Sequence, residues 1–105
     1  MTQKSYLYLL TPEDRKRHEH IQEKNRITGF SVQYETLIEG KWIPVVRFDT
    51  AHGFAHKDLY TRSGKKTKIM LGPVSYAEAL NLADKDIREN WGVYKRAFLK
   101  QGGTK

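Results

Sequence analysis

The sequence predicts an α+β domain in which a small antiparallel four-stranded meander packs against a long C-terminal amphipathic helix. Two observations carry this prediction: apolar and polar residues alternate through the middle of the chain, and an apolar stripe recurs at helical spacing towards its end. A short strand or turn and then a short polar helix are expected before the meander. At 105 residues the chain is expected to be a single domain, 1–105, with a flexible tail at 101–105.

The polar N-terminal helix is predicted from the segment TPED at residues 11–14. Thr11 suits an N-cap, Pro12 suits the first helical position, and the two acids that follow complement the positive end of the helix dipole. The expected helix runs from Pro12 to Lys24 or Asn25. Its only strong apolar residue is Ile21, so it is interpreted as a solvated surface element.

The four strands are predicted from alternation and from turn residues. Residues 29–39 alternate cleanly, and Gly40 marks a turn into a returning strand, Trp42–Asp49. Pro44 cannot donate a ladder hydrogen bond, so it should occupy an edge, a bulge or an unpaired position. A second hairpin is expected from Asp58–Arg62 and Thr67–Leu71. The buried face of the first strand should consist of Phe30, Val32, Tyr34, Thr36 and Ile38.

The long helix carries the strongest signal in the chain. Ser75 and Glu78 have the spacing of a capping box, in which each side chain bonds the other residue's backbone N–H. The apolar stripe that follows is interpreted as core rather than as a cofactor site. It consists of Tyr76, Leu80, Ala83, Ile87, Trp91, Tyr94 and Phe98.

Composition narrows the classes of function. The formal net charge of +7 favours an anionic partner, nucleic acid first, although a merely solubilising surface would look the same. The absence of cysteine excludes disulfides, thiolate zinc sites and a cysteine nucleophile. No apolar run is long enough to span a bilayer or to form a signal peptide, so a cytoplasmic protein without a membrane partner is expected.

The densest group of chemically active residue types lies in VVRFDTAHGFAHKDLY, residues 45–60. Arg47 and Asp49 are two positions apart on a strand and therefore point the same way. The first interpretation is a metal-independent phosphodiester-cleaving site. Arg47 would bind phosphate and Asp49 would orient a partner, while His52 and His56 would act as general base and acid, with Lys57 adding charge.

Two other interpretations of this stretch remain open. Asp49, His52, His56 and Asp58 have the donor types of a divalent metal site, for zinc or another transition metal, although the spacing matches no specific motif. Alternatively the stretch is structural. Arg47 and Asp49 would then form an ion pair, Asp49 would cap the turn, and the histidines would be hydrogen-bonding loop residues.

The predicted second hairpin is strongly basic. It carries five cations against the single acid Asp58, and Tyr60 lies among them as a residue able to stack on a base. Cations of this kind either bind the backbone of a nucleic acid or protect an edge strand from aggregation. The residues assigned to nucleic-acid binding are Lys57, Tyr60, Arg62, Lys65, Lys66 and Lys68.

The run from Val45 to Asp58, preceded by Tyr34-Glu35-Thr36 and the turn before Trp42, resembles a group of small prokaryotic proteins. That group is itself similar to the TumE-like toxins of toxin–antitoxin pairs. The resemblance covers residues 30–100 and includes the C-terminal helix. Those toxins carry a denser histidine cluster where this chain has Gly53-Phe54-Ala55. The resemblance implies a growth-inhibiting protein that acts on RNA or translation.

The resulting hypothesis is a toxin-like basic protein that binds RNA and cleaves it without metal or other cofactor. Its catalytic residues would be Arg47, Asp49, His52 and His56, and the resemblance points to the same four positions. The resemblance also implies an antitoxin protein as a partner, and a homodimer is a further expectation. The alternative is a non-catalytic module that binds nucleic acid or protein.

Overall fold

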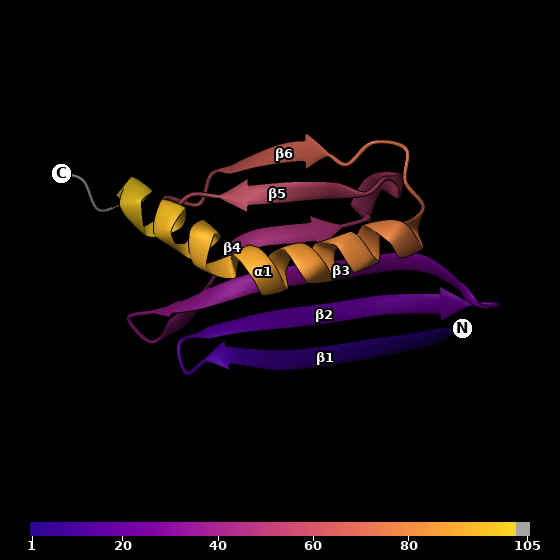
Figure 1. Cartoon of the computed structure of the whole chain (residues 1–105), viewed down its shortest axis with the longest axis horizontal. Coiled ribbons are helices and arrows are strands. Elements are labelled where there is room, and N and C mark those ends of the chain that lie inside the picture. The colour runs from indigo at the N-terminus through magenta and orange to yellow at the C-terminus, as the bar shows by residue number, and fades with distance from the viewer. Residues whose placement is uncertain (103–105) are drawn as a thin grey trace.

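The computed structural model describes residues 1–102, with side chains described through residue 100. A six-stranded antiparallel sheet of order β1-β2-β3-β4-β5-β6 forms one layer, and helix α1 crosses one of its faces (Figure 1). The strands are β1 (Thr2–Thr11), β2 (Asp14–Glu23), β3 (Arg26–Ile38), β4 (Lys41–Asp49), β5 (His56–Tyr60) and β6 (Lys66–Met70). A short 3₁₀ turn, η1 (Ala51–Gly53), joins β4 to β5, and α1 spans Tyr76–Gly102.

The predicted four-stranded meander with a polar N-terminal helix is wrong, because residues 2–23 form a β-hairpin. The TPED segment is the turn of that hairpin. The Thr11 hydroxyl accepts a hydrogen bond from the Glu13 N–H at 3.0 Å, as an N-cap would, but it also donates to Asp14 Oδ2 at 2.6 Å. A side chain that caps a helix can equally close a tight turn, and here the paired strand formed instead.

Helix α1 and the buried face of the sheet form the core, as the sequence predicted. Val32, Tyr34 and Phe48 are almost fully buried from the sheet side, and Ala83 and Ile87 are buried from the helix side. The capping box is confirmed: Glu78 N–H donates to Ser75 Oγ and Ser75 N–H donates to Glu78 Oε1. No helix within residues 1–102 is long and apolar enough to cross a membrane.

A β-bulge interrupts the pairing of β3 with β4. Tyr34 pairs with Val46 and Glu35 pairs with Pro44, so the expected special position for Pro44 is confirmed as a bulge. The bulge reverses the side-chain alternation before it. Trp42 therefore lies on the face opposite Val46, whereas uninterrupted alternation would have placed both on the same face.

Both edges of the sheet are exposed. Leu7 and Leu9 on β1 are 57% and 69% exposed, and every residue of β6 is exposed.

Gln101 and Gly102, expected to belong to a flexible tail, are the last residues of α1. The rest of that expected tail, residues 103–105, lies outside the described residues.

Candidate functional site

Arg47, Asp49, His56 and Asp58 lie together on the sheet face that α1 does not cover. Their neighbours Phe48 and Lys57 point the other way, and Lys57 contacts Tyr94 of α1. Since side chains alternate along a strand, the four residues share the open face of β4 and β5. Three of the four predicted catalytic residues are therefore brought together, and Asp58 joins them.

His56 is the centre of this group. Its side chain is 3% exposed, and its Nε2 lies 2.9 Å from Asp49 Oδ1 and 3.5 Å from Asp58 Oδ2. The other ring nitrogen, Nδ1, donates to the backbone carbonyl of Phe54 at 3.3 Å. The imidazole is thus fixed from both sides, with two carboxylates at Nε2.

Arg47 lies at the border of the group. Its Nε donates to Gln33 Oε1 at 2.6 Å, and its Nη1 is 4.0 Å from Asp49 Oδ2. The guanidinium carbon is 5.8 Å from the centre of the Tyr60 ring, within the range of a cation–π contact. With a third of its side chain exposed, Arg47 keeps donors available for an anion on the open face.

His52, the fourth predicted catalytic residue, lies apart from this group. It is exposed in η1 with a backbone φ of +73°, and it makes no hydrogen bond or ion pair with any residue through Lys100. Asp49 Oδ1 accepts a hydrogen bond from the Ala51 N–H at 3.2 Å, so this carboxylate also caps the turn that carries His52. Turn capping by Asp49 was predicted as one part of the structural interpretation of residues 45–60, and this hydrogen bond confirms that part.

The residues assigned to nucleic-acid binding divide between the two faces of the sheet. Lys57 lies on the helix side, where its Nζ is 3.1 Å from the Tyr94 hydroxyl, so it does not act with Arg47 or His56. The remaining cations are exposed on β6 and on the turn before it, and Tyr60 is half-buried on the open face. The exposed cations are Arg62, Lys65, Lys66 and Lys68.

A second polar cluster lies on the other face, beside α1. His18 Nδ1 donates to Asp84 Oδ1 at 3.2 Å, and His18 Nε2 is 2.8 Å from His20 Nδ1. If His18 is neutral, its Nε2 accepts the His20 Nδ1–H, which leaves the lone pair of His20 at Nε2. A carboxylate and two imidazoles thus form one hydrogen-bonded chain, flanked by Tyr6, whose ring lies 5.4 Å from that of His18.

Sequence reasoning did not identify this cluster because HEH was placed on a helix. On a strand, residues two apart share a face, so His18 and His20 are neighbours, whereas on a helix they would diverge. Asp84 comes from α1, 66 residues after His18. No local sequence motif predicts the contact between these two residues. The available signal was the pair of histidines at a spacing of two.

Burial lowers the pKa of His20 below its ordinary value. The charges of His18 and Lys4 lower this pKa further by smaller amounts, whereas the Asp84 carboxylate raises it. Replacing His18 with glutamine should therefore raise the pKa of His20, and Asp84→Asn should lower it further. An NMR titration of the His20 ring resonances in the unchanged chain and in each variant measures both shifts. Three superimposable His20 curves would show that the ring is uncoupled from the cluster.

Comparison with known proteins gives a family but no activity. A family model described as a domain of unknown function, DUF7718, matches residues 1–104. The chain belongs to the DUF7718 family. No curated protein and no solved structure matches this DUF7718 chain. The similarity to TumE-like toxins therefore stays a prediction that rests on the residues at 45–58.

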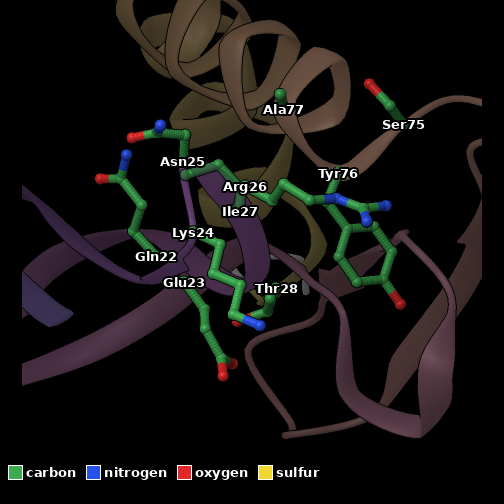
Figure 2. Close-up of a pocket in the computed structure, with 10 residues that line it drawn as sticks. All are labelled: Gln22, Glu23, Lys24, Asn25, Arg26, Ile27, Thr28, Ser75, Tyr76 and Ala77. Atoms are coloured by element: carbon green, nitrogen blue, oxygen red, sulfur yellow. The ribbon is translucent and has the colours of Figure 1, made fainter. Parts of the chain in front are cut away.

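A groove of the DUF7718 chain lies elsewhere, between the β2–β3 turn and the start of α1. It encloses about 730 Å³ and is lined by Arg26, Ile27 and Tyr76 among others. Figure 2 shows that the polar side chains around it point in different directions rather than towards one point. None of the predicted site residues lines it, so the groove adds nothing to the two polar clusters.

Proposed function

We propose that the protein binds RNA through the β5–β6 hairpin and the open sheet face beside it. One observation carries the proposal: the four cations of β6 and its turn are exposed, whereas Asp58, the only acid of the hairpin, is 1% exposed. The hairpin therefore presents four cations and no exposed acid to solvent. Such a surface attracts the phosphate backbone and releases its counterions.

Residues beside the hairpin supply contacts of a second kind. Tyr60 lies on the same face with Arg47 near its ring, and a half-buried tyrosine on a sheet is a platform on which an unpaired base stacks. Phosphate contacts from β6 and stacking on Tyr60 would suit single-stranded RNA. Duplex RNA hides its bases, which makes it the weaker ligand for this face.

The test is a triple substitution, Arg62→Ala/Lys65→Ala/Lys68→Ala, with affinity for a labelled single-stranded RNA measured at several salt concentrations. Loss of three phosphate contacts should weaken binding at least tenfold, since each contact contributes to affinity, and should reduce the slope of log affinity against log salt by about 2. Lys66 is left unchanged because it lies 3.8 Å from Asp58.

A matched control removes the same charge elsewhere. Lys24→Ala/Lys85→Ala/Arg88→Ala takes three exposed cations from other elements, so both variants fall from a net charge of +7 to +4. The control should keep most of the affinity and of the salt slope. If both variants lose affinity equally, binding depends on total charge, and the hairpin is not the interface.

RNA cleavage and growth inhibition are proposed as consequences of this binding, supported by the residues at 45–58 and their resemblance to TumE-like toxins. The same labelled RNA, run on a denaturing gel after incubation, reports cleavage by the unchanged chain and by Arg47→Ala. Expression of the chain and of the hairpin triple variant in a bacterium reports whether any growth defect depends on the basic surface. Binding without cleavage or growth defect favours the non-catalytic alternative.

A further inference from the structure

We propose that Asp49, His56 and Asp58 bind one divalent transition-metal ion, of the class of zinc or manganese. The proposal goes beyond RNA binding and does not rest on it. Within residues 1–102, these three are the one group of at least three His, Asp or Glu residues whose potential ligand atoms all lie within 4.8 Å of one another. One imidazole nitrogen and two carboxylate oxygens form a donor set that such ions accept.

The buried carboxylate of Asp58 is the observation that points to a cation. Its side chain is 2% exposed, and Oδ1 is buried without any hydrogen-bond partner. Its other oxygen is 3.5 Å from His56 Nε2 and 3.8 Å from Lys66 Nζ, and both distances are long for a charge-assisted hydrogen bond. A buried carboxylate without a close donor is costly unless it is paired or coordinates a metal.

The hydrogen bonding of His56 points the same way. A backbone carbonyl only accepts, so the contact with Phe54 places a proton on Nδ1. In the neutral imidazole, Nε2 then carries a lone pair, and that lone pair is directed at Asp49 Oδ1, 2.9 Å away. Two lone pairs that face each other repel, unless a cation or a second ring proton lies between them.

A metal ion is the occupant that satisfies both residues. A protonated ring has a single Nε2 proton, which Asp49 Oδ1 takes at 2.9 Å, and it would leave the Asp58 carboxylate without a donor closer than 3.5 Å. An ion bound by Nε2 and by one oxygen of each aspartate neutralises both carboxylates. The Nδ1–H bond to Phe54 then has the form usual for metal-bound histidines, which donate their second ring nitrogen to a carbonyl or carboxylate.

The cations around the group are placed so that they compete with a bound ion without blocking it. Lys66 is half exposed and Arg47 one-third exposed, and they lie 3.8 Å and 4.0 Å from the nearest carboxylate oxygens. Neither makes a direct hydrogen bond to Asp49 or Asp58 at those distances. Lys66 can therefore swing into solvent, and its removal should strengthen metal binding.

The experiment is a calorimetric titration of the chelator-treated chain, free of any polyhistidine tag, with Zn²⁺, Mn²⁺, Mg²⁺ and Ca²⁺. One Zn²⁺ should bind per chain, Mn²⁺ should bind more weakly, and Mg²⁺ and Ca²⁺ weakest, because an imidazole favours transition metals over hard cations. Asp49→Asn and Asp58→Asn should each lower the affinity for zinc by about 100-fold or more, since each removes a ligand. Lys66→Ala should raise it by about fivefold or more.

Two further variants keep the test specific. His52→Gln removes an exposed imidazole from the same loop and should bind zinc as the unchanged chain does. His18→Gln disrupts the other histidine cluster and should also leave binding intact. Because Asp58 is buried, the substitutions at Asp49 and Lys66 decide the matter if Asp58→Asn fails to fold. The proposal is overturned if the unchanged chain binds no zinc, if both aspartate variants keep its affinity, or if His52→Gln loses it.

Discussion

Replacing Asp14 with asparagine is expected to lower the free energy of unfolding by about 2 to 4 kcal/mol. The Asp14 carboxylate is 1% exposed and accepts four hydrogen bonds. Oδ1 accepts from the Tyr34 hydroxyl at 2.6 Å and from Thr36 at 2.9 Å, while Oδ2 accepts from Thr11 at 2.6 Å and from Lys95 at 3.1 Å. The substitution removes the charge that Lys95 faces and leaves buried donors unpaired.

The same carboxylate predicts a dependence on pH. Burial alone would raise the pKa of Asp14, but the hydrogen bonds from Thr11, Tyr34, Lys95 and Thr36 together hold it below the ordinary value of 3.8. A lowered pKa in the folded state contributes stability that is complete above the unfolded-state pKa and is lost as the pH falls through the folded-state pKa. The difference between the unchanged chain and Asp14→Asn should therefore shrink only in strong acid.

Urea unfolding at pH 7 and at a series of pH values below 4 measures both effects. Glu13→Gln is the matched control, since it removes an exposed carboxylate from the adjacent position and should change stability by less than about 0.5 kcal/mol. Equal stability of the Asp14 and Glu13 variants at pH 7 would contradict the prediction.

Replacing Ile87 with alanine should cost about 2 to 5 kcal/mol, because its fully buried side chain is part of the core between α1 and the sheet. The long helix is held chiefly by its contacts with β3 and β4. A cavity at its midpoint should therefore loosen the whole helical layer.

The control for this substitution is Leu82→Ala on the same helix, where the side chain is 47% exposed and the expected loss is much smaller. Both variants keep a good helix former at the altered position, so helix propensity does not account for a difference between them. Chemical unfolding followed by circular dichroism gives the two free energies. Similar losses would show that α1 does not pack on the sheet through Ile87.

The parts of the fold that could be predicted are those in which burial imposes a period on the sequence. The alternation through Phe30, Val32 and Tyr34 and the stripe through Ala83 and Ile87 both face the same core, and both were predicted correctly. The β1–β2 hairpin was missed because its side of the sheet is only partly covered. The inward positions of β2 are Asp14, Lys16, His18 and His20, so no apolar period marks the strand.

The candidate site was predictable to the extent that it is local. Arg47 and Asp49 are on one strand and His56 begins the next, so pairing of Asp49 with His56 brings them together. The place of His52 could not be derived, because the left-handed backbone of η1 decides its direction. The contact of Asp84 with His18 joins segments far apart in the chain, which requires the whole topology.

The two borders of the sheet differ in a way that limits self-association. Two copies that met along β1 would cover Leu7 and Leu9 and extend the hydrogen bonding into a continuous sheet of twice the width. Both outer borders of that sheet would then be copies of β6, which carry Lys66 and Lys68 and repel each other. Growth would stop at a pair, and a fibre would not form.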